Sequence, residues 1–128
     1  MRQDPNEHYF HVVVGGRRLE CRSIGEPGSR SPTLVFLHEG LGSIALWRDF
    51  PDRVCAAAGL PGIVYSRRGY GGSEPIDEPR SVRFMHEEAI DVLPELLRSF
   101  GLERPILVGH SDGASIALIH AGTFPQAD

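Results

Sequence analysis

The sequence has no lysine: its thirteen basic residues are all arginine. A lysine Schiff base and the lysine of a phosphate-binding P-loop are therefore excluded. Cysteine is almost as scarce, because Cys21 and Cys55 are the only two and each lies in an ordinary apolar segment. A disulfide framework needs more cysteines than this, so we expect two buried free thiols.

Long apolar runs and an excess of positive charge are missing as well. No apolar stretch is long enough to cross a bilayer, and the polar first ten residues lack the hydrophobic centre of a secretory signal. The formal net charge is −4, whereas a nucleic-acid binder carries a basic surface. We therefore expect a cytoplasmic protein with no membrane or nucleic-acid partner.

The composition is that of an ordinary globular chain. Of its 128 residues, 41% are hydrophobic and 23% are charged, so we expect residues 1–128 to form a single domain with a real core. Between residues 9 and 24, two segments flank Gly15 and Gly16, which indicates a hairpin closed by a tight turn.

Three further segments are apolar on both faces, as strands buried within a sheet are. They are residues 33–38, 62–67 and 105–110, and a helical pattern follows each, around residues 46–59, 85–100 and 113–124. Pro94 interrupts the second helical pattern and predicts a kink. The alternation predicts an α/β fold, with an N-terminal hairpin plus a mostly parallel, doubly wound sheet that has helices on both faces.

The segment PILVGHSDGAS places a serine where the third buried strand passes into a helix. A sharp strand-to-helix turn holds such a serine in a strained conformation, clear of the sheet, and crowds the residues two before and two after it. Gly109 and Gly113 occupy those two positions around Ser111. This is the G-x-S-x-G pattern of a nucleophile elbow in its required context, and it makes Ser111 the candidate nucleophile.

Together with two further motifs, this pattern resembles the α/β-hydrolase superfamily over essentially the whole chain. LVFLHEGLGS is similar to the third strand of that family and its oxyanion loop, and SRRGYGGS to the loop D-x-R-G-x-G-x-S after the fourth strand. GHSDGA is similar to the elbow. Two positions depart from the family pattern, because Glu39 stands where glycine is common and Ser66 where aspartate is frequent.

The resemblance implies a serine hydrolase that acts on a carbonyl substrate such as an ester or an amide. Ser111 would attack the carbonyl carbon, and two backbone N–H groups would receive the developing oxyanion. One is the N–H of Asp112, at the start of a helix, where the dipole also favours negative charge. By resemblance to the family, the other is the N–H of Gly40. We expect a small-molecule substrate, no cofactor and no metal.

A general base for Ser111 is missing from the sequence. In this fold the acid and then the histidine follow the serine along the chain, but only seventeen residues follow Ser111. Among them His120 lies about 13 Å further along the helix, too far to reach the hydroxyl. Strand alternation points His110 away from Ser111, and we expect His38 to shape the oxyanion loop. These observations predict the N-terminal part of a larger hydrolase, inactive as an isolated chain.

The same reasoning leaves the strand at residues 105–110 with an exposed apolar edge, through which the chain could self-associate. Two alternatives to a hydrolase remain open at this stage. One is a non-catalytic doubly wound module that binds a ligand or a partner. The other is a truncated pseudoenzyme or assembly fragment retained for partner binding.

Overall fold

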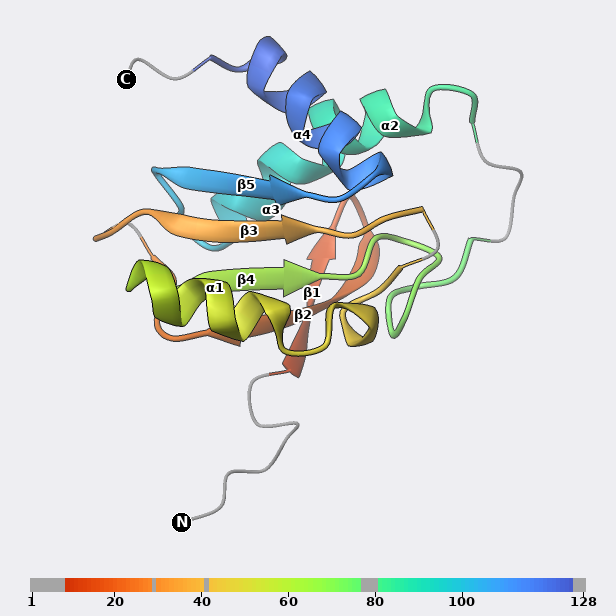
Figure 1. The fold of residues 1–128 in the computed structure, drawn as a ribbon. Coiled ribbons are helices and arrows are strands. Elements are labelled where there is room, and N and C mark those ends of the chain that lie inside the picture. The colour runs from red at the N-terminus through yellow and green to blue at the C-terminus, as the bar shows by residue number, and fades with distance from the viewer. Residues whose placement is uncertain (1–8, 29, 41, 77–80, 126–128) are drawn as a thin grey trace.

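A computed structural model describes residues 9–28, 30–40, 42–76 and 81–125. Its core is a five-stranded sheet in the order β1-β2-β4-β3-β5 (Figure 1). The strands are β1 (Tyr9–Val14), β2 (Arg17–Ile24), β3 (Thr33–Leu37), β4 (Gly62–Tyr65) and β5 (Pro105–Gly109). The helical segments are η1 (Ala45–Trp47), α1 (Phe50–Ala58), α2 (Phe84–Glu87), η2 (Glu88–Val92), α3 (Leu93–Ser99) and α4 (Asp112–Thr123).

The predicted hairpin is confirmed. β1 and β2 pair antiparallel, with Val14 opposite Arg17, and the turn between them has φ of 58° at Gly15 and 76° at Gly16. Positive φ at both central residues is the geometry that glycine adopts without cost. β2 then pairs antiparallel with β4, which attaches the hairpin to the rest of the sheet.

The parallel part of the sheet consists of β4, β3 and β5, as the alternation of strands and helices predicts. Along β3, side chains alternate between two apolar clusters, because successive residues of a strand face opposite ways. Val35 and Leu37 pack with residues of α3 and α4, whereas Leu34 and Phe36 pack with Cys55 of α1. Helix α1 accordingly covers one face, and α3 and α4 cover the other (Figure 1). The predicted fold class is confirmed.

Both cysteines are buried and free, as predicted. Burial raises the pKa of the Cys21 thiol to about 12, and neighbouring Glu20 adds to the shift. Burial also raises the pKa of Cys55. Because the thiolate is the reactive form of cysteine, neither residue is suited to act as a nucleophile.

The expectation of a fully buried strand at residues 105–110 is wrong in one respect. The residues of β5 are only partly buried, and Ile106 is 42% exposed. The reason is its position, because β5 pairs with β3 on one side and stands at the end of the described sheet. The apolar edge expected from the sequence is therefore present. Among the described residues, no helix has the length and apolar character needed to span a membrane.

A π-helical turn precedes Pro94, a local distortion of the kind that accompanies the kink predicted from the sequence. The turn is η2, and the N–H of Leu93 donates to the carbonyl of Glu88, five residues back. In an α-helix that N–H would bond to Ala89, and Pro94 has no N–H to take its place. The Nδ1 atom of His120 lies 2.9 Å from the Ala89 carbonyl oxygen and supplies the missing donor.

Candidate functional site

Ser111 occupies a strained turn between β5 and α4. Its backbone has φ of 56° and ψ of −117°, and besides Arg48 it is the only described non-glycine residue with positive φ. Ser111 is the N-cap residue of α4, a position where serine normally bonds to the first turn of the helix. Its side chain makes no such bond here, and the residue is exposed to solvent. The hydroxyl therefore stands clear of the sheet.

The two flanking glycines are required by the packing of this turn. A Cβ atom at Gly109 would overlap the carbonyl oxygen of Gly113 and the backbone of Ala114. A Cβ atom at Gly113 would overlap the carbonyl group of Leu37, at the end of β3. The helix therefore approaches both strands more closely than any side chain allows. The turn is also anchored to β3 by a hydrogen bond of 3.1 Å from the His110 N–H to the Leu37 carbonyl.

Gly40 and Asp112, the residues predicted to supply N–H groups, lie next to each other. A Cβ atom at Gly40 would be only 2.5 Å from Oδ2 of Asp112. Gly40 follows β3 and Asp112 follows β5, so both lie at the carboxyl ends of parallel neighbours. The N–H of Asp112 belongs to the first turn of α4, where backbone donors have no partner within the helix.

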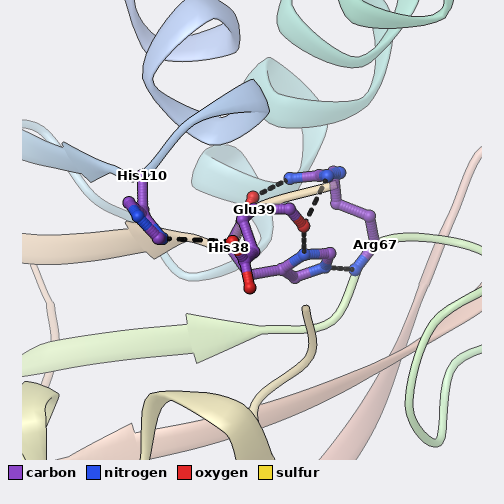
Figure 2. Close-up of polar contacts among 4 residues, drawn as sticks. All are labelled: His38, Glu39, Arg67 and His110. Carbon is purple, nitrogen blue, oxygen red and sulfur yellow. Dashed lines mark hydrogen bonds and ion pairs between the residues drawn. The ribbon is translucent and has the colours of Figure 1, made fainter. Parts of the chain in front are cut away.

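Arg67 and His38 hold the segment that leads to Gly40 (Figure 2). The Arg67 backbone N–H donates to Nε2 of His38 at 2.9 Å, so the proton of this imidazole is on Nδ1. Nδ1 donates to the Glu39 carbonyl at 2.6 Å. The Arg67 guanidinium donates to the carbonyls of both His38 and Glu39. His38 therefore shapes this loop, as expected, and its ring nitrogens are committed to it.

Glu39, which stands where glycine is common in the family motif, turns its side chain toward His110. Its Oε2 lies 3.8 Å from Nδ1 of His110, and the two side chains are 45% and 64% exposed. Figure 2 shows Arg67 and His110 on opposite sides of the loop. The His110 ring also lies 6.3 Å from that of Trp47, centre to centre. His110 is thus directed to Glu39 and Trp47, consistent with the strand alternation.

Ser66 is supported by a carboxylate from another strand. Its hydroxyl donates to Oε1 of Glu20 on β2 and accepts the N–H of Ile44 at 3.0 Å. The Gly72 N–H also donates to Oε1 of Glu20, at 3.1 Å. Glu20 thus supplies a carboxylate at a place where the family often has aspartate. Sequence reasoning missed both Glu20 and Arg67, because their contacts join segments 28 or more residues apart.

No general base for Ser111 is apparent among the described residues. His120 is buried in α4 and bonded to Ala89, and His38 is bonded within the loop. His11 contacts the Gly72 carbonyl at 3.1 Å, far along the sheet on β1. In the described ranges, no three His, Cys, Asp or Glu residues are grouped so as to hold a metal ion.

Comparison with known families agrees with this geometry. The sequence profile of the alpha/beta hydrolase fold family matches residues 32–127, which include β3, β4, the turn at Ser111 and α4.

Individual relatives include several kinds of hydrolase. The chain is 30% identical over 110 residues to the proline iminopeptidase of Lactobacillus delbrueckii subsp. lactis, an alignment that covers 86% of this chain and 37% of that protein. It is 30% identical over 111 residues to epoxide hydrolase B of Mycobacterium tuberculosis, covering 87% of this chain and 30% of that protein. The chain thus spans less than two fifths of the length of these relatives.

Solved structures show the same fold. An epoxide hydrolase from Vigna radiata superposes with a TM-score of 0.76 over 97% of this chain and 37% of its own, at 24% sequence identity. An enzyme that degrades N-acyl homoserine lactones superposes with a TM-score of 0.70 at 27% identity, over 91% of this chain and 41% of its own.

Proposed function

The chain belongs to the α/β-hydrolase family, and from this premise we propose that it carries the nucleophile and the oxyanion-binding loop of a serine hydrolase. The substrate class is a carbonyl compound such as an ester or an amide. The relatives named above include a peptidase and a lactone-degrading enzyme, whose substrates contain a carbonyl group, and epoxide hydrolases, whose substrates do not. The choice of a carbonyl substrate therefore depends on Ser111 and the oxyanion-binding loop, and the proposal names no single substrate.

The observation that carries the proposal is the turn at Ser111. A strained backbone at a non-glycine residue is costly and persists where the surrounding structure imposes it. Here the close approach of α4 to β3 and β5 imposes it, at two glycines that no other residue could replace without displacing backbone. The result is an exposed hydroxyl at the carboxyl ends of parallel strands, where ligands of such sheets bind.

In the proposed reaction, the Ser111 oxygen attacks the carbonyl carbon while a general base removes its proton. The carbonyl oxygen becomes an oxyanion that accepts hydrogen bonds from the N–H groups of Asp112 and Gly40. Collapse of the tetrahedral intermediate expels the leaving group and leaves an acyl-serine, which water then hydrolyses. We propose that the acid and the base come from residues outside 1–128, since each described histidine near the site has another partner.

A fluorophosphonate probe tests this assignment, because it forms a covalent bond only with an activated serine. The polypeptide encoded by the complete reading frame that contains residues 1–128 should be labelled once, and the labelled tryptic peptide should contain Ser111. Ser111→Ala should abolish labelling and ester hydrolysis. Ser115→Ala should leave both unchanged, because Ser115 is an exposed serine one turn further along α4.

The 128-residue chain by itself should hydrolyse p-nitrophenyl esters no faster than its Ser111→Ala variant. Rapid turnover that Ser111→Ala abolishes would place the base within residues 1–128. Failure of the longer polypeptide to be labelled at Ser111 would instead favour the non-catalytic binding module considered from the sequence.

A further inference from the structure

We propose that Arg67 is a positioning residue for the oxyanion hole and that it acts through the peptide bond between Glu39 and Gly40. This inference rests on the proposed function, because it assigns a task to the Gly40 N–H in that reaction. Arg67 occupies the variable second position of the loop motif SRRGYGGS, and it is buried, with 3% exposure.

Three hydrogen bonds converge on the Glu39 carbonyl oxygen. The donors are Nδ1 of His38 at 2.6 Å, the N–H of Gly42 at 3.0 Å and Nη2 of Arg67 at 3.2 Å. A peptide group is planar, and in its trans form the N–H points opposite to the carbonyl. Because no described peptide bond is cis, orienting the Glu39 carbonyl also orients the Gly40 N–H.

The same contacts make the Gly40 N–H a stronger donor. Hydrogen bonds to a carbonyl polarise its peptide group, and a charged donor has the larger effect. Arg67 supplies the only charged donor of the three. Its second contact, to the His38 carbonyl, prevents the guanidinium from swinging away from the loop.

The charge of Arg67 also matters for the electrostatics of the site. The carboxylate of Asp112 lies against Gly40, and that of Glu39 projects from the adjacent residue. Two negative charges oppose the formation of an oxyanion nearby. A buried guanidinium directly behind the loop offsets them, and in a low-dielectric interior its effect is larger than that of an exposed charge. The exposed side chain of His110 also lies 3.8 Å from the Glu39 carboxylate.

The first experiment observes this peptide directly. Glu39–Gly40 is the only Glu-Gly dipeptide in the chain, so labelling glutamate with ¹³C at the carbonyl and glycine with ¹⁵N yields one correlated peak. In Arg67→Gln we expect the Gly40 amide proton and the Glu39 carbonyl carbon to shift upfield, as a hydrogen bond to the carbonyl is lost. Arg53→Gln is the matched control, because Arg53 is an exposed arginine of α1 and should leave the peak in place.

The second experiment measures kinetics of the longer polypeptide. We expect Arg67→Gln to lower kcat by about tenfold to a hundredfold, part of the loss typical of a missing oxyanion donor. KM should change by less than about threefold, because the oxyanion forms only after binding. Affinity for a trifluoromethyl ketone, which forms the tetrahedral adduct, should fall in parallel with kcat/KM. Arg67→Lys, which keeps the charge but not both carbonyl contacts, should lie between wild type and Arg67→Gln.

Two results would overturn the inference: an unmoved Glu39–Gly40 peak in a folded Arg67→Gln variant, or unchanged kcat and ketone affinity. If Arg67→Gln does not fold, Arg67→Lys is read in the same way, with smaller changes expected. The outcome is separable from that of the proposed function. An enzyme without an active Ser111 fails the phosphonate test in its wild-type form, whereas failure of this inference leaves wild-type labelling intact and removes only the effect of Arg67.

Discussion

Individual residues around Ser111 show how the close packing of backbone creates an exposed hydroxyl. Gly113 lies against the carbonyl of Leu37 and Gly109 against the first turn of α4, so helix and strands meet without intervening side chains. The chain turns sharply at Ser111, which therefore adopts a positive φ. The strain at the serine is therefore imposed by contacts two residues away on either side.

Substitution of one glycine in this turn tests that account. Gly113→Ala should lower the free energy of unfolding by about 2–3 kcal/mol, because the new methyl group must displace the backbone of β3. Gly122→Ala, in the same helix, should raise it by about 0.5–1 kcal/mol, since nothing lies within 4 Å of that position. Urea denaturation measures both, and equal effects of the two substitutions would contradict the account.

At the scale of elements, the π-helical turn η2 is hydrogen-bonded to α4, the helix that follows Ser111. Pro94 cannot donate to a carbonyl one turn back, and the N–H of Leu93 is already used by Glu88. The Ala89 carbonyl therefore accepts from His120 of α4. His120 is a structural residue, and its bond holds α4 against η2.

A double-mutant cycle separates this bond from ordinary packing. His120→Ala should destabilise the protein, because it leaves a buried carbonyl without a donor, at a cost of about 1–3 kcal/mol beyond the lost packing. Pro94→Ala restores an N–H in the same stretch of helix. We therefore expect His120→Ala to cost less in the Pro94→Ala background, by on the order of 1 kcal/mol. Additive effects in thermal or urea unfolding would show that the two residues do not share the carbonyl.

Across the molecule, the faces of the sheet and its edge at β5 differ in how well they are covered. Both faces are covered by helices, whereas β5 lies at the end of the described sheet, with Ile106 42% exposed. Beside it, Leu118 of α4 is 75% exposed, and Phe124, which follows α4, is 41% exposed. Both residues border a cavity of about 370 Å³ that is lined in part by Leu107. An apolar strand edge of this kind favours pairing with another chain.

We accordingly expect the 128-residue chain to self-associate through β5. Sedimentation velocity should show dimers or larger species, and Ile106→Lys should shift them toward monomer by placing a charge on the edge. Val82→Lys serves as the control, because Val82 is fully exposed at 101% but lies before α2 and not on β5. A monodisperse wild-type monomer would contradict this expectation.

The hairpin, the order of strands and helices and the turn at Ser111 could be predicted from the sequence alone, because these features follow from local patterns. Glycines at 15 and 16, apolar runs of strand length and the spacing of Gly109 and Gly113 each act over a few residues. The contacts that join distant segments became known only from the folded chain. The hydrogen bonds from Arg67 to the loop before Gly40, from Ser66 to Glu20 and from His120 to Ala89 span 28 to 46 residues. They could not be predicted because the hydrogen-bond partners of buried polar groups are set by packing, and no local periodicity encodes which strand or helix comes to lie beside them.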